Sequence, residues 1–78
     1  MNNITLYREV NDKVRYYSLK LQPTLFGEHL FIREYGNVKN KRPTRIIKEY
    51  YEIADEAISA FKSKFLEKQK RGYATKLD

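Results

Sequence analysis

The sequence of 78 residues contains no cysteine and a single histidine, His29. The absence of cysteine excludes disulfides, thiolate nucleophiles and cysteine-ligated zinc or iron–sulfur sites. Without a thiol no Cys–His pair exists, and a Ser–His–Asp set could be placed only by pairing His29 with arbitrary hydroxyls, so we expect no catalytic residues and no enzyme activity. The acidic residues lack the spacing of a metal-binding loop, and the three glycines are too scattered to cradle a phosphate. We therefore expect neither a metal nor a cofactor.

The sequence also lacks a long hydrophobic run. No apolar stretch approaches the roughly 18 residues of a membrane helix, and the polar start Met1-Asn2-Asn3 is unlike a secretory signal. We expect a cytoplasmic protein with no membrane contact. Apolar residues make up 41% and aromatics 14% of the chain, which is enough to build a core despite 33% charged residues. The length predicts one small domain over residues 1–78.

Positive charge is unevenly distributed along the chain. The formal net charge is +6, and most of the excess lies after residue 35. Residues 39–48 contain no acidic residue and five cations: Lys39, Lys41, Arg42, Arg45 and Lys48. Such a cluster indicates a phosphate-bearing partner, with a solvated basic loop as the alternative.

The first two thirds of the chain predict strands. Polar and apolar residues alternate over residues 4–10 and 14–22, with a turn expected at Asn11-Asp12. Residues 29–35 and 43–51, rich in β-branched and aromatic residues, predict a third and a fourth strand. We expect Gly36 to end the third strand. The result is a four-stranded antiparallel sheet.

The pattern changes to a helical one over residues 53–71. Ala57, Ile58, Phe61 and Phe65 recur at spacings of three and four, which is typical of an amphipathic helix, and we expect these four residues to pack against the sheet. Acidic residues in its first turn, basic residues in its last and Gly72 after it suit the ends of a helix. We predict an α+β fold in which this C-terminal helix covers one face of the sheet.

The basic stretch defines the candidate binding residues. Lys39, Lys41, Arg42 and Arg45 are expected to contact phosphates, with Tyr35 beside them as a ring that packs on sugar or base. Ordinary strand packing is the alternative for Tyr35.

Three short segments resemble the WGR domain family. The first segment resembles the family's central strand and its Trp-Gly-Arg turn: Leu30-Phe31-Ile32-Arg33-Glu34-Tyr35-Gly36-Asn37-Val38. Residues 51–61 are similar to the acidic start of the family's only long helix. The end of that helix is similar to Lys70-Arg71-Gly72-Tyr73 here. The likeness covers roughly residues 14 to 73.

The resemblance implies a sheet backed by one helix, no activity of its own and nucleic acid as a partner. In the poly(ADP-ribose) polymerases that contain WGR domains, the Trp packs against sugar at a DNA end and the Arg helps join the domain to DNA and to its neighbours. Here Tyr35 stands at the Trp position and Asn37 at the Arg position. Asn37 supplies neither the charge nor the bidentate fork of arginine.

Two hypotheses for function follow. The first is a WGR-like module that binds DNA weakly through phosphate contacts, at a site formed by Tyr35, Asn37, Lys39, Lys41, Arg42 and Arg45. The second is an interaction module for an acidic protein partner or a neighbouring domain. Salt sensitivity of binding to duplex DNA distinguishes the two.

Overall fold

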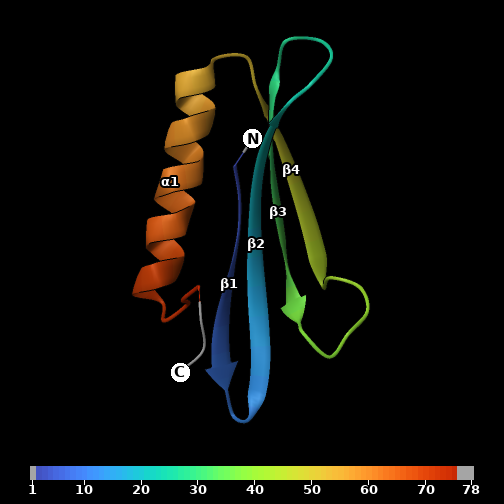
Figure 1. Ribbon diagram of the computed structural model, residues 1–78, viewed down its shortest axis with the longest axis vertical. Coiled ribbons are helices and arrows are strands. Elements are labelled where there is room, and N and C mark those ends of the chain that lie inside the picture. Colours follow the sequence, from blue (N-terminus) through green and yellow to red (C-terminus); the bar gives the residue numbers. More distant parts are fainter. Residues whose placement is uncertain (1, 76–78) are drawn as a thin grey trace.

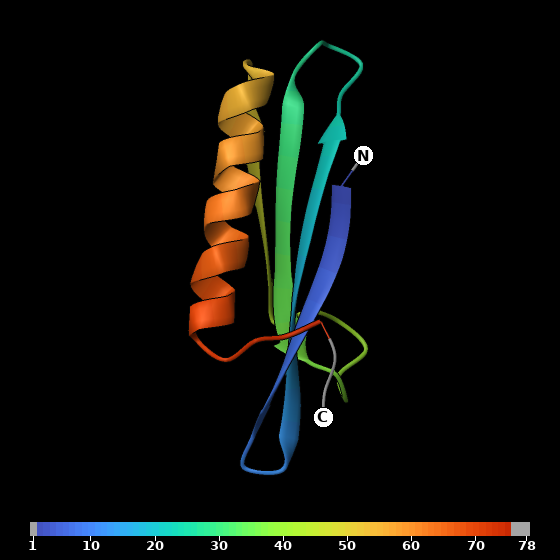
Figure 2. The same cartoon turned by 60° about the vertical axis from the view of Figure 1, so that its left-hand side comes forward.

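A computed structural model describes residues 2–75 of the chain. The elements in chain order are the strands β1 (Asn2–Val10), β2 (Lys13–Pro23), β3 (His29–Asn37) and β4 (Arg45–Tyr51) and the helix α1 (Ala54–Lys70). The strands form one antiparallel sheet in the order β1-β2-β3-β4 (Figure 1). Seen from the side, α1 lies along one face of this sheet (Figure 2). The predicted α+β architecture is confirmed.

A two-residue turn joins β1 to β2. Asn11 and Asp12 both have positive φ, 51° and 64°, the conformation of a tight hairpin turn whose twist matches that of the flanking strands. Asn and Asp adopt it more readily than other non-glycine residues. The turn sets a register in which Leu6 lies opposite Tyr17.

The core lies between α1 and the sheet face that it covers. Leu6, Leu19 and Phe31 are the largest fully buried side chains, and they occupy alternate strand positions that point to the helix side. From α1, Ala57 is fully buried, and the ring of Phe61 lies 5.9 Å from that of Phe31, centroid to centroid.

The helix has the predicted extent but presents a narrower apolar face than expected. Of the four predicted core residues of α1, Ala57 is buried, Phe61 and Phe65 are half-buried, and Ile58 is 36% exposed. The prediction that Ile58 packs in the core was therefore wrong. The sheet-facing line of α1 runs through Ala57 and Phe61, and one residue further along a helix turns by about 100°, which puts Ile58 on the flank.

The third strand is longer than predicted, because β3 continues through Gly36 to Asn37, which pair with Tyr16 and Arg15 of β2. A Cβ atom on Gly36 would lie 2.8 Å from the backbone nitrogen of Thr44. The expectation that Gly36 ends the strand was wrong: this glycine remains in the ladder and allows the returning chain to approach closely.

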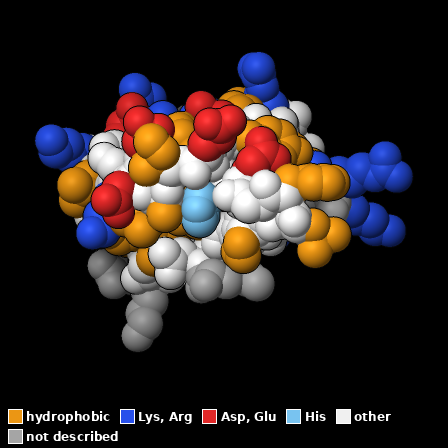
Figure 3. Space-filling model, turned by 90° about the horizontal axis from the view of Figure 1, so that it is seen from above, with side chains coloured by type: hydrophobic (Ala, Val, Ile, Leu, Met, Phe, Trp, Pro, Cys, Tyr) orange, Lys and Arg blue, Asp and Glu red, His pale blue; other side chains and the backbone are white. Residues whose placement is uncertain are grey.

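Charge is separated along the molecule, which measures 42 × 25 × 15 Å. The end at which α1 begins shows several acidic side chains around the single histidine, with Lys and Arg at the periphery (Figure 3). The first turn of α1 carries Asp55 and Glu56, whereas its last turn carries Lys68 and Lys70. Within residues 2–75, no helix is long and apolar enough to cross a membrane.

Candidate nucleic-acid interface

The basic loop, residues 38–44, connects β3 to β4 and is closed at its base by hydrogen bonds. The Thr44 N–H donates to the Tyr35 carbonyl oxygen at 2.8 Å. The Lys39 N–H donates to the Asn37 side-chain oxygen at 3.0 Å, and the Asn40 N–H to the Asn37 carbonyl oxygen at 3.0 Å. Asn37 thus shapes the turn with its own side chain, as Asn does in many loops.

The predicted phosphate-binding cations lie in the loop and at the start of β4. Lys39, Lys41, Arg42 and Arg45 are all exposed, and none belongs to an ion pair among residues 2–75. Their charge is therefore available to a partner.

Tyr35 connects this loop to the helix side of the sheet. It lies directly opposite Tyr17 on β2 and Arg45 on β4, and antiparallel partners share a face. Its ring is half-buried and packs against the core cluster. The structure thus supports the packing alternative for Tyr35, while the ring also borders a cavity between α1 and the sheet.

This cavity, which we call the cationic cavity, has a volume of about 660 Å³. It draws residues from every strand, from α1 and from the segment after it. Three tyrosines, Tyr17, Tyr35 and Tyr73, form part of its wall. Among residues 2–75, its cationic residues are Arg8, Arg15, Arg33, Lys64, Lys68 and Arg71, and its one carboxylate is Glu67.

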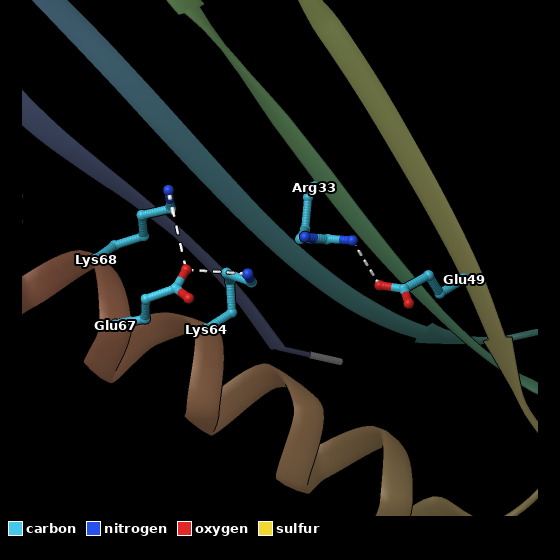
Figure 4. A network of polar contacts seen from close by, with 5 residues as sticks. All are labelled: Arg33, Glu49, Lys64, Glu67 and Lys68. Atoms are coloured by element: carbon cyan, nitrogen blue, oxygen red, sulfur yellow. Dashed lines mark hydrogen bonds and ion pairs between the residues drawn. The ribbon is translucent and has the colours of Figure 1, made fainter.

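Two carboxylates neutralise part of this charge (Figure 4). Glu67 accepts a hydrogen bond from Lys64 Nζ at 2.9 Å and lies 4.0 Å from Lys68 Nζ. Glu49 on β4 accepts a hydrogen bond from Arg33 Nη2 at 2.8 Å. The Nε atom of Arg33 is buried and has no hydrogen-bond partner among the described residues.

Lys68 is held against aromatic rings. Its Nζ lies 4.4 Å from the centre of the Tyr17 ring and 5.9 Å from that of Tyr73, a cation–π arrangement. Burial lowers the pKa of Lys68 below its usual value, against the opposing effect of Glu67. The hydrogen bond from Lys64 is the main cause that holds the pKa of Glu67 below its usual value.

The predicted site residues thus divide between two surfaces. The end of β3, the basic loop and the start of β4 carry Asn37, Lys39, Lys41, Arg42 and Arg45, whereas Tyr35 also lines the cationic cavity. Sequence reasoning missed the cavity. One signal was present: Arg8 and Arg33 interrupt the apolar alternation of β1 and β3, at positions that share the helix side with Leu6 and Phe31. Charge at a core-facing position is typical of a functional or paired site.

The fold and the distribution of charge define this chain as a small α+β module with a cation-rich end. The chain belongs to the WGR domain family, whose sequence profile matches residues 3–78. WGR domains are found in poly(ADP-ribose) polymerases and in other proteins and are associated with nucleic-acid binding. The match confirms the resemblance and extends it over β1. Comparison with curated proteins and with solved structures gives no match.

Proposed function

We propose that this WGR domain is a non-catalytic module that binds duplex DNA through the basic loop and Arg45. The observation that carries the proposal is the exposure of Lys39, Lys41, Arg42 and Arg45 without ion-pair partners among residues 2–75. Cations of this kind attract the phosphate backbone by releasing its condensed counterions. The association of WGR domains with nucleic acid supports the same conclusion.

In this proposal Tyr35 and Asn37 position the loop. The Tyr35 carbonyl oxygen holds Thr44 at the far end of the loop, and the Asn37 side chain holds Lys39. The Tyr35 ring can also pack on a nucleotide at its exposed edge, because it is only half-buried.

Binding should be weak, with little preference for base sequence, because no helix presents a base-reading set. Four phosphate contacts predict a slope of about −3.6 for log affinity against log salt, from about −0.9 per contact on duplex DNA. A titration of labelled duplex at several salt concentrations measures this slope.

A pair of variants with equal charge provides the control. Lys39→Gln with Lys41→Gln should reduce the magnitude of the slope by about 1.8, that is about 0.9 for each contact. Lys62→Gln with Lys70→Gln removes the same charge from exposed positions on α1 and should change the slope much less. Equal effects of the two pairs would show that only net charge matters. No binding at about 100 μM protein and low salt would favour an acidic protein partner instead.

A further inference from the structure

The cationic cavity contains more positive charge than residues 2–75 neutralise. Six cationic side chains line it, and Glu67 and Glu49 are the carboxylates paired with them, which leaves an excess of four. Arg8, Arg15 and Arg71 belong to none of the ion pairs among residues 2–75. The C-terminal end of α1 offsets part of this excess, because a helix dipole places about half a negative charge there.

Part of this charge is held in a semi-buried setting, and one of its N–H donors lacks a hydrogen-bond acceptor within residues 2–75. The Arg33 side chain is only 16% exposed, and its Nε has no acceptor within residues 2–75. A buried donor left without an acceptor is unfavourable, because no hydrogen bond offsets its loss of contact with water. Lys68, 14% exposed, is likewise partly desolvated, so an anion in the cavity would interact with both groups more strongly than in bulk water.

We propose that the cationic cavity binds the phosphate dianion of a small phosphomonoester. Arginine matches the oxygens of phosphate with paired N–H donors, and three strands each place one arginine on the cavity wall: Arg8, Arg15 and Arg33. A doubly charged group matches the excess of cations better than a carboxylate does. The Tyr35 and Tyr73 rings give the carrier of the phosphate an apolar wall.

The volume and position of the cavity favour a small ligand. About 660 Å³ lies within the range of small-molecule sites, roughly 300 to 1,000 Å³. The cavity lies between α1 and the sheet, and the segment after α1 is tied to β1 by reciprocal hydrogen bonds between Tyr7 and Ala74 at 2.7 and 2.9 Å. None of the loop cations Lys39, Lys41 and Arg42 lines it. The cations of this site are therefore distinct from those of the function proposed for the basic loop, and the two surfaces share only Tyr35.

The test is a titration of the 78-residue protein with ribose 5-phosphate and with sulfate, in which binding is measured by calorimetry or by changes in amide chemical shifts. Arg8→Gln with Arg15→Gln removes two exposed cations that make no ion pair among residues 2–75, so the fold should persist. We expect this variant to bind ribose 5-phosphate about five- to ten-fold more weakly. Lys39→Gln with Lys41→Gln, the control of equal charge, should bind it as the unmodified protein does.

A substitution of opposite sign provides a second readout. Glu67→Gln removes the cavity's carboxylate and should tighten binding of ribose 5-phosphate by about two- to five-fold. The proposal would be overturned if both double variants weakened binding of ribose 5-phosphate equally, or if neither of them nor Glu67→Gln changed it. Absence of binding at about 10 mM ligand would also overturn it.

The pH dependence of binding tests whether the cavity prefers the phosphate dianion to its singly charged form. A phosphomonoester loses its second charge below a pKa of about 6, whereas sulfate does not. The charged groups that face the ligand are Arg8, Arg15, Arg33, Lys64, Lys68 and Arg71, with Glu67 and Glu49 beside them. A fall in pH cannot make any of these groups more negative, so they do not weaken anion binding. Ribose 5-phosphate should therefore bind more weakly at about pH 5 than at about pH 7.5, and sulfate should not. Weakening of both ligands together would contradict the proposal.

Duplex DNA provides the final arm of the experiment. The Arg8→Gln with Arg15→Gln variant should keep most of its affinity for duplex, and ribose 5-phosphate should not displace bound duplex. Displacement of the duplex would show that both ligands use one site and would overturn a separate small-ligand site. Failure of duplex binding alone leaves the cavity titration unaffected, so the two proposals can fail separately.

Discussion

The rings of Tyr17 and Tyr35 stack on neighbouring strands with their centroids 5.2 Å apart and their planes 5° from parallel. Lys68 lies over the Tyr17 ring, and Tyr73 meets the same ring at 73°. The stack therefore joins the beginning of the basic loop, at Tyr35, to the end of α1. A change at Tyr35 should affect both stability and the position of the loop.

Tyr35→Ala should lower the free energy of unfolding by about 2 kcal/mol, because it removes a half-buried ring and the stacking contact of that ring with Tyr17. Tyr35→Phe keeps the ring and should change stability by less than about 0.5 kcal/mol. Urea unfolding followed by circular dichroism measures both. Full stability of Tyr35→Ala would mean that the stack contributes nothing and that Tyr35 is free to act as a nucleotide platform.

Gly36→Ala should destabilise the domain by about 1 to 3 kcal/mol, because its Cβ would lie 2.8 Å from the Thr44 nitrogen. The hydrogen bond from Thr44 to Tyr35 should weaken, and the Thr44 amide should exchange faster with solvent. The comparison is Gly27→Ala, where φ is +82° and nothing lies within 4 Å of the new Cβ.

At Gly27 the effect should arise from the backbone conformation alone, about 1 kcal/mol, and Asn should recover part of it because Asn tolerates positive φ. Asn at position 36 should recover nothing. A Gly36→Ala protein with unchanged stability and unchanged Thr44 exchange would show that the loop base can open at little cost.

Phe61→Ala should lower the free energy of unfolding by about 2 to 4 kcal/mol, since Phe61 is half-buried and its ring meets that of Phe31. Ile58→Ala, on the flank of the same helix, should lower it by less than about 1 kcal/mol. Equal losses in urea unfolding would argue that α1 is rotated relative to the sheet from the orientation seen here.

The ion pair of Glu67 with Lys64 predicts a dependence of stability on pH. The hydrogen bond and charge of Lys64 hold the pKa of Glu67 below its ordinary value of 4.5. A carboxyl whose pKa is lowered in the folded state stabilises the protein above its unfolded-state pKa, and this contribution is lost as the pH falls through the folded-state pKa. Because the Glu67 side chain is 43% exposed, the effect should be small and weakened by salt.

Urea midpoints above and below pH 4.5 measure this contribution. The unmodified protein should lose more stability on acidification than Glu67→Gln does. Glu52→Gln, at an exposed position that makes no ion pair within residues 2–75, should retain the acid dependence of the unmodified protein. Identical acid profiles for Glu67→Gln and the unmodified protein would mean that the ion pair does not form in solution.

The sequence by itself predicted the elements of this protein, because their signals are local. Alternation of polar and apolar residues identified the first two strands, and β-branched and aromatic residues identified the other two. Asn11 and Asp12 identified the hairpin turn, and the spacing of Ala57 and Phe61 identified the helix to within one residue at each end. Each of these features depends on residues close together in the chain.

Only the tertiary structure decided what those elements bring together. The continuation of β3 through Gly36 depends on where Thr44 returns, and the exposure of Ile58 depends on how α1 is rotated on the sheet. The cationic cavity gathers side chains from residues 8 to 73, which become neighbours only through strand register and helix docking. Charge acts through distance in space, so the positions of these cations along the chain do not reveal that they converge around one cavity.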